Sequence, residues 1–283
     1  MAKQTDNQVS AVRRAKHGWI LTLFFSILAV FYLYPIFLVL INSLKKKGFI
    51  MKSPFALPDE RSFFGMTNFV KGIEKTNFFA AFGNSVIITV GSVAVIIFCT
   101  SMCAWFITRV HNKFTMALYM LCLFSMIVPF QMVMFPLSKL ANMMHLSNPI
   151  GIILVYLGFG AGLAVFMFCG FVKSIPLEIE EAAKIDGANG WKTFWKITVP
   201  LLKPTIIMTF IMSINGTLQL FDESMNLTKG GPANSTITMS HYVYNTCFVN
   251  VPNFGYAAAM SFIIFIMVAI LAFINLKVGD TRD

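Results

Sequence analysis

Long apolar stretches separated by polar segments dominate the pattern of this sequence. Each stretch is long enough to cross the roughly 30 Å of hydrocarbon in a bilayer. Because backbone groups in lipid must bond to one another, each stretch is predicted to be a helix. The six stretches run approximately over Trp19–Ile41, Asn84–Thr108, Thr115–Leu137, Ile150–Val172, Leu201–Phe221 and Gly255–Leu276. The pattern therefore predicts an all-α polytopic membrane protein with six transmembrane helices.

The composition supports a chain that lies mostly in lipid. Of the 283 residues, 57% are apolar and 12% are charged, whereas a soluble domain is about 25% charged. Too few polar side chains remain to cover a soluble globule of this length, so soluble, disordered and secreted disulfide-scaffold classes are excluded. The five cysteines fall mostly inside apolar stretches and are interpreted as small buried hydrophobic residues.

The first apolar stretch follows a basic segment and could be mistaken for a secretory signal peptide. At about 23 residues it is too long for the apolar region of such a peptide, and no small-x-small cleavage site follows it. It is predicted to be an uncleaved first helix.

The basic residues suggest an orientation in the membrane. The net charge of +10 is interpreted as the usual excess of basic residues beside anionic headgroups, not as a nucleic-acid surface. With both termini in the cytoplasm, 13 of the 22 Lys and Arg residues fall inside and 9 outside. This count favours cytoplasmic termini, but the triplet Lys45–Lys47 in the first outer loop argues against them.

The polar segment after the fourth stretch is predicted to form a helix, a turn and a second helix at the cytoplasmic surface. Pro176 suits the first helical position, and acidic residues in the first turns suit the helix dipole. Gly187 permits a sharp turn, and a second helix is expected from Asn189 to about Thr198. From residue types alone, this could be an amphipathic helix with no protein partner. The adjacent Ala182 and Ala183 favour instead a surface that another protein approaches closely.

This segment also carries a family resemblance. Glu181-Ala182-Ala183, Asp186-Gly187-Ala188 and the downstream Ile197, Val199 and Pro200 resemble the "EAA" signature of the membrane subunits of ATP-binding-cassette (ABC) importers. From about His17 to Leu276 the chain resembles the permeases that import di- and oligosaccharides. Further supporting phrases are Ser53–Pro58, Gly230–Asn234 and Phe254–Ser261.

The resemblance implies a type I importer permease fold with a cytoplasmic coupling (EAA) helix. Residues 1–83 would hold the N-terminal tail, first transmembrane helix and outer loop, and residues 84–283 a five-helix permease core with the coupling helix at about 176–198. In the family this helix docks into a groove on a separate ATPase. The residues implied for docking are Glu181, Ala182, Ala183, Asp186 and Gly187.

The resemblance also implies a set of partners. They are a second homologous permease, two ATP-binding subunits on the cytoplasmic side, an extracellular or periplasmic sugar-binding protein and the lipid of a bacterial cell membrane. The sequence contains no Gly-x-x-x-x-Gly-Lys-Ser/Thr loop to cradle phosphates. We therefore expect no enzyme activity, catalytic residue, metal or cofactor on this chain, with ATP and Mg on the partner ATPase.

Polar residues in the fifth stretch are candidates for the solute path, because polar groups inside a membrane are costly and tend to face a cavity. Asn215 and Gln219 are the best candidates, since sugars are bound by amides, hydroxyls and aromatic faces. Further candidates are Asn84, Gln131 and Tyr156. The alternative for all of them is hydrogen bonding between helices without solute contact.

Other features have less specific interpretations. The pair Gly158 and Gly162 predicts close helix packing, and Pro129 and Pro136 predict a kink in the third helix. The outer loop 222–254 either touches a binding protein and lines the outer mouth, or is an ordinary ordered loop.

Three other functions fit the sequence less well. A lipid-modifying membrane enzyme needs clustered catalytic groups, but the four histidines are scattered. An ion-coupled secondary transporter is expected to carry titratable residues near mid-membrane, and no Asp, Glu, Lys, Arg or His lies near the middle of any of the six stretches. An importer permease for a non-sugar solute is the closest alternative.

Overall fold

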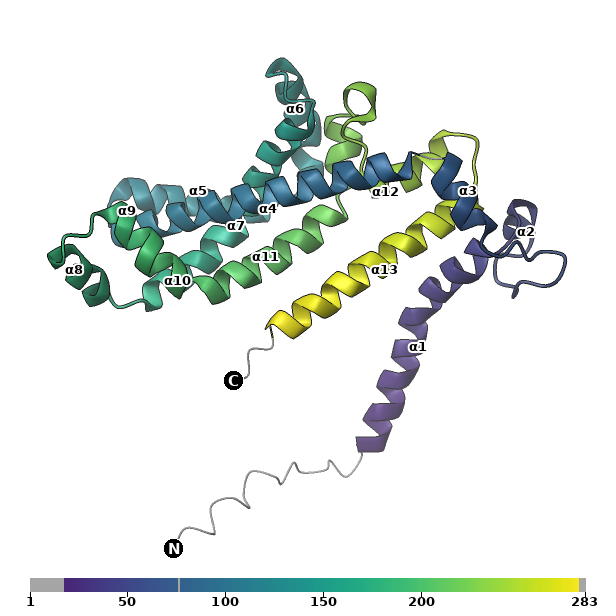
Figure 1. Cartoon of the computed structure of the whole chain (residues 1–283), viewed down its shortest axis with the longest axis horizontal. Helices are drawn as coiled ribbons and strands as arrows, with labels where there is room; N and C mark the ends of the chain where they lie inside the picture. Colours follow the sequence, from purple (N-terminus) through teal and green to yellow (C-terminus); the bar gives the residue numbers. More distant parts are fainter. Residues whose placement is uncertain (1–17, 76, 280–283) are drawn as a thin grey trace, which may run out of the picture.

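The computed structural model describes residues 18–75 and 77–279, and in this part the chain is helical (Figure 1). Four helices are long and apolar enough to span a membrane: α1 (Gly18–Ser43), α4 (Phe78–Arg109), α7 (Pro149–Ser174) and α13 (Phe254–Gly279). Two bent helix pairs raise the number of candidate spans from four to six. The all-helical prediction is therefore confirmed. The basic residues Lys3, Arg13, Arg14, Lys16 and Arg282, used to predict the orientation, lie outside the described residues.

The third apolar stretch is not one helix. The predicted kink at Pro129 is a full break: α5 (Lys113–Ile127) and α6 (Phe130–Met143) meet at 109° within the stretch Thr115–Leu137. The break falls at Val128, whose backbone is extended. A residue before proline is pushed out of the helical region, so Pro129 explains the break, while Pro136 lies inside α6. In Figure 1, α6 projects away from the layer formed by α4 and α7.

The fifth stretch is bent as well. Helix α11 (Lys203–Leu218) is shorter than the predicted Leu201–Phe221 and makes an angle of 73° with the preceding helical segment Gly190–Leu201. That segment consists of α9 (Gly190–Thr193), η1 (Phe194–Thr198) and α10 (Val199–Leu201). The segment Gly190–Leu201 therefore does not continue the axis of α11.

The core lies where α4 and α7 run side by side, with α5 and α11 packed against them. Ile96 of α4 and Phe168 of α7 are buried in this core. Gly162 lets α7 approach α5, since a Cβ there would lie 2.5 Å from the carbonyl oxygen of Cys122. A Cβ on Gly158 would meet nothing within 4 Å. The predicted glycine pair thus supports close packing at Gly162 only.

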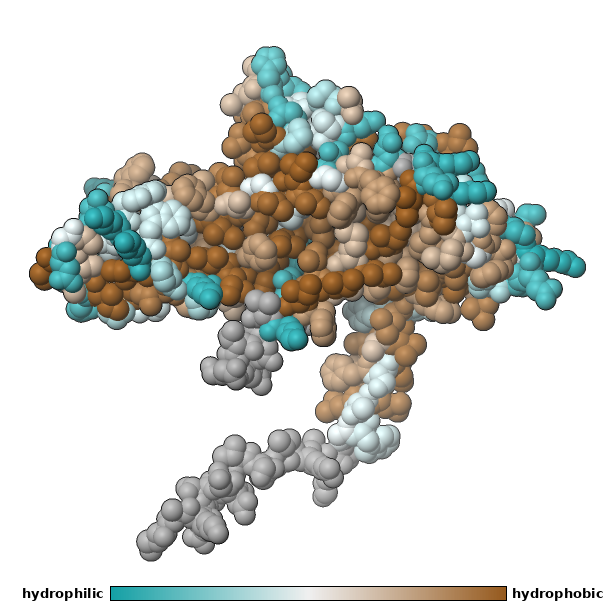
Figure 2. Space-filling model, in the orientation of Figure 1, coloured by the Kyte–Doolittle hydropathy of each residue, from teal (hydrophilic) through white to brown (hydrophobic). Residues whose placement is uncertain are grey.

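Helix α1 is apolar around its whole circumference and packs against α13 near its C-terminal end, where Ile41 and Ser43 are buried. Figure 1 shows α1 leaving the body of the molecule, and Figure 2 shows the apolar surface that α1 and the helices of the body expose. A helix that is apolar all round requires lipid or other helices around it.

Two of the three lysines that argue against the predicted orientation, Lys45 and Lys46, form hydrogen bonds within the loop between α1 and α4. This loop contains α2 (Lys47–Lys52) and α3 (Thr67–Lys75). The Nζ of the fully buried Lys45 donates to Asn42 Oδ1 at 3.1 Å and to the carbonyl oxygen of Ser53 at 3.0 Å, and burial lowers the pKa of this lysine. Lys46 Nζ donates to the carbonyl oxygen of Arg61 at 2.8 Å. Both ammonium groups hold this loop together.

The segment between α11 and α13 is also ordered. It contains η2 (Glu223–Leu227), η3 (Pro232–Asn234), α12 (Met239–Tyr244) and η4 (Asn245–Val249). Ser224 Oγ lies 2.8 Å from His241 Nδ1 and donates to the carbonyl oxygen of Thr236 at 2.6 Å. Burial lowers the pKa of His241, which favours a neutral ring in this network.

Candidate functional site

The predicted helix-turn-helix between the fourth and fifth stretches is confirmed. The first helix is α8 (Leu177–Ile185); Pro176 lies just before it, at the N-cap and not at the first helical position. Gly187 has φ +80°, a conformation that side chains with a Cβ resist. The turn is closed by a hydrogen bond of 2.9 Å from Ala188 N to the carbonyl oxygen of Ala183. Asn189 Oδ1 then accepts from Lys192 N at 2.9 Å and caps α9.

Four of the five predicted docking residues lie on the surface: Glu181, Ala182, Asp186 and Gly187 are exposed. Ala183 is buried instead and belongs to the inner face of α8. Ile185, which the sequence analysis did not select, is 86% exposed beside the turn. The exposed end of α8 thus combines two acids, small residues and one large apolar side chain.

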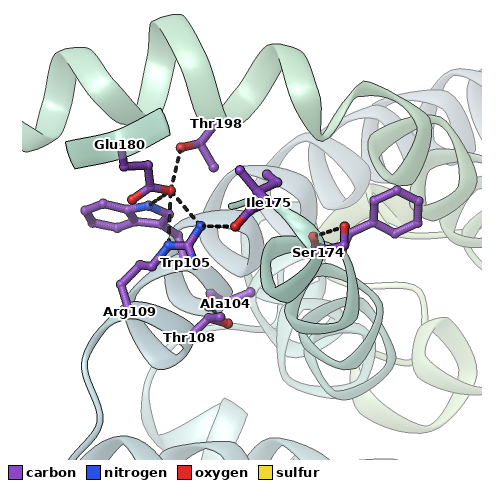
Figure 3. Close-up of polar contacts among 9 residues, drawn as sticks. Ala104, Trp105, Thr108, Arg109, Ser174, Ile175, Glu180 and Thr198 are labelled. Atoms are coloured by element: carbon purple, nitrogen blue, oxygen red, sulfur yellow. Dashed lines mark hydrogen bonds and ion pairs between the residues drawn. The ribbon is translucent and has the colours of Figure 1, made fainter. Parts of the chain in front are cut away.

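The inner face of α8 is fixed by Glu180, whose role the sequence analysis did not predict. Glu180 is 1% exposed, and its Oε1 lies 2.9 Å from Nη2 of Arg109 at the end of α4. Trp105 Nε1 donates to the same oxygen at 3.3 Å and Thr198 Oγ1 at 3.4 Å. Figure 3 shows these groups converging on one carboxylate. Arg109 Nη2 also donates to the carbonyl oxygen of Ile175 at 3.1 Å.

Aromatic side chains fix the second half of the segment to the same helix. The rings of Trp105 and Phe194 lie 5.8 Å apart in an edge-to-face arrangement, and those of Phe98 and Trp195 lie 6.0 Å apart. Such pairs add to the stabilisation that burial provides. Both halves of the helix-turn-helix therefore contact α4.

A cavity of about 260 Å³ lies between α4, α6, α7 and α11. Tyr156 lines it together with the rings of Phe130 and Phe159, and its hydroxyl donates to the carbonyl oxygen of Gly216 at 3.2 Å. Glu223 also lines the cavity and is 9% exposed. Burial raises the pKa of this carboxyl to about 7. Aromatic faces beside a carboxyl group and hydroxyls are suited to binding a polyhydroxylated solute.

The other four path candidates do not line this cavity. Asn84 Nδ2 donates to the carbonyl oxygens of Asn234 and Ile237 at 3.0 and 3.2 Å, which joins α4 to the segment between α11 and α13. Gln131 Nε2 donates to Asp222 Oδ2 at 2.7 Å. Asn215 and Gln219 are exposed on and just after α11. The five predicted residues therefore do not form one site in this chain.

Comparison with known proteins assigns the family. Residues 96–280 match the family described as "Binding-protein-dependent transport system inner membrane component". The chain belongs to this family of multi-pass membrane proteins, the permease subunits of ABC importers. ATP binds to a separate ATPase subunit of these complexes, so this chain is not itself the ATPase.

Several relatives are carbohydrate permeases. The chain is 34% identical to the lactose transport system permease protein LacF of Rhizobium radiobacter, with 94% of this chain and 95% of that protein aligned. It is 34% identical to a probable starch degradation products permease, AmyC, of Thermoanaerobacterium thermosulfurigenes, with 69% of this chain and 70% of that protein aligned. A bacterial alginate importer shares the fold, with a TM-score of 0.77 and 19% identity over 92% of this chain and 95% of that one.

Proposed function

We propose that this chain is one permease subunit of a carbohydrate importer. In this proposal it forms half of the translocation path beside a second homologous permease and transmits the closure of two cytoplasmic ATPases to that path. The observation that carries the proposal is the exposed turn at the end of α8, where small residues and two acids surround a glycine in a conformation that other residues resist.

The exposed end of α8 is suited to inserting into a groove on the ATPase. Ala182 leaves room for a close approach, while Glu181 and Asp186 supply polar contacts at the edge of such a groove. Gly187 holds the turn that exposes them. This assignment requires α8 to face the cytoplasm, and therefore both termini to lie there.

We propose that the solute is a di- or oligosaccharide, because the names of relatives such as the lactose and starch degradation products permeases indicate such solutes for those proteins. Tyr156 and Glu223 are the residues best placed to contact it, because they line the cavity beside Phe130 and Phe159. A sugar offers hydroxyls to the carboxyl group and C–H faces to the aromatic rings. A binding protein on the outer side delivers the solute in this proposal.

Gly187→Trp tests the docking assignment, with Gly187→Asn as its control. Asn tolerates positive φ far better than other residues with a Cβ, so the control keeps the turn while the Trp variant distorts and fills it. We expect the Trp variant to lose co-purification with the ATPase and ATP-driven uptake of labelled lactose or maltooligosaccharides, and the Asn variant to retain most of both. Full assembly and uptake in the Trp variant would contradict the assignment.

A further inference from the structure

We propose that the cytoplasmic segment 177–198 moves as one body with α4, and that Glu180 is the positioning residue that joins the two. This segment is called the coupling segment below. The inference rests on the proposed function and extends it, because it names the helix that carries the motion of the ATPases into the membrane.

The first connection between the coupling segment and α4 is polar. Glu180 forms the one ion pair found in the described part of the chain, and Trp105 and Arg109 of α4 both donate to it. Thr198, at the far end of the coupling segment, donates to the same carboxylate oxygen. One buried carboxylate thus connects the first helix of the segment, its last residues and the inner end of α4 (Figure 3).

The second connection is aromatic and lies on the same side of α4. Trp105 contacts Glu180 through its indole N–H and Phe194 through its ring. Phe98, about two turns earlier in α4, packs against Trp195, which in turn packs against Trp191 at 5.7 Å. A rotation of the coupling segment about Glu180 alone would have to separate these rings.

The covalent connection to α7 is less rigid. Helix α7 ends at Ser174, and Ile175 and Pro176 both have extended backbone angles before α8 begins. Two extended residues do not transmit a torque as a continuous helix does. The carbonyl oxygen of Ile175 accepts a hydrogen bond from Arg109. This linker is therefore also attached to α4.

Helix α4 is long enough to carry motion between the two membrane surfaces. Its 32 residues span about 48 Å at 1.5 Å per residue. Near its outer end, Ser85 Oγ accepts from Met239 N at 3.0 Å, and Asn84 bonds to the carbonyl oxygens of Asn234 and Ile237. Helix α4 therefore contacts the coupling segment at one end and the outer loop at the other.

The experiment measures motion at the outer surface in the complex with its co-purified ATPase in lipid nanodiscs. The five native cysteines are replaced, and Val251→Cys, at a loop position that is 83% exposed, carries an environment-sensitive fluorophore. The fluorescence change on adding ATP and vanadate is compared for the unsubstituted chain and Glu180→Gln. We expect the Glu180→Gln variant to bind the ATPase normally. We expect its fluorescence change to be smaller by a factor of about five or more, since coupling free energies commonly change equilibria by that factor.

Matched variants separate positioning from docking and from folding. Glu178→Gln alters an exposed acid on the same helix and is expected to give the full signal. The double variant Arg109→Gln with Glu180→Gln is expected to give more signal than Arg109→Gln alone, because the single change leaves a buried charge without a partner. If Glu180→Gln fails to accumulate, Trp105→Phe with Thr198→Val removes two donors and keeps the ion pair, and a reduced signal is again expected.

Two results would overturn the inference. The first is a full fluorescence change in Glu180→Gln, or in the double variant Trp105→Phe with Thr198→Val that replaces it. The second is a Glu180→Gln variant that loses its bound ATPase while each complex that remains gives a normal fluorescence change. Failure of the unsubstituted chain to co-purify any ATPase would contradict the proposed function instead, so the two failures are distinguishable.

Discussion

At the scale of single residues, two buried acids of this protein, Glu180 and Glu223, differ in their surroundings. Glu180 is paired with a cation, whereas Glu223 is buried with no hydrogen bond from another residue in the described part of the chain. Burying a carboxylate without a partner favours its neutral form. Burial accordingly raises the pKa of Glu223 to about 7, whereas Glu180 is held by its ion pair with Arg109.

The raised pKa of Glu223 predicts a pH-dependent stability. The folded-state pKa of about 7 lies above the usual 4.5, so the folded state binds the proton more tightly than the unfolded state does. The stability from this group is complete below about pH 4.5 and is lost as the pH rises through about 7. We expect the melting temperature in detergent to fall over this range, and Glu223→Gln to flatten that fall. An unchanged slope in the variant would contradict the assignment.

At the scale of helices, close packing decides where small residues are required. Gly162 and Gly158 lie one turn apart on α7, yet a Cβ at Gly162 meets backbone of α5 and a Cβ at Gly158 meets open space. The spacing of a glycine pair does not reveal this difference, because it depends on which face of α7 another helix covers.

The two glycines provide a matched test of helix packing. Gly162→Val forces α5 and α7 apart, and overpacking of this kind typically costs about 1–3 kcal/mol. Gly158→Val adds the same side chain where nothing lies within 4 Å. We expect the melting temperature to drop by several degrees in Gly162→Val and to change much less in Gly158→Val. Equal effects would show that both positions respond only to helix propensity.

At the scale of the whole molecule, the polar ends and the apolar body define how the chain lies in a membrane. The coupling segment and the outer loops lie at opposite ends of α4, so they face opposite sides of a bilayer that α4 spans. The ammonium groups of Lys45 and Lys46 donate hydrogen bonds within the loop between α1 and α4. These two residues are therefore weaker evidence against a cytoplasmic N-terminus.

This arrangement predicts an orientation that labelling can measure. In a cysteine-free background, Val251→Cys is expected to react with a membrane-impermeant maleimide on intact cells, because the proposed function places its loop on the outer side. Lys184→Cys on α8, also exposed, is expected to react only after the membrane is opened. The reverse pattern would place the coupling segment outside the cell and contradict the proposed function.

The sequence by itself determined the membrane class, the helical fold, the approximate ranges of the apolar stretches and the helix-turn-helix around Gly187. These features are local: hydrophobic length, proline and glycine act over a few neighbouring residues. The break at Val128 was predicted only as a kink, since a proline shows where a helix is weak and not how far it bends.

Only the tertiary structure decided which distant residues meet. Arg109 and Glu180 are separated by 71 positions, and Asn84 reaches a loop 150 positions away. No pattern within one helix indicates such partners, because they are set by how the helices pack. Four of the five residues predicted on the exposed side of α8 are exposed, but the buried position of Ala183 and the side that fixes α8 to α4 are decided by the folded chain.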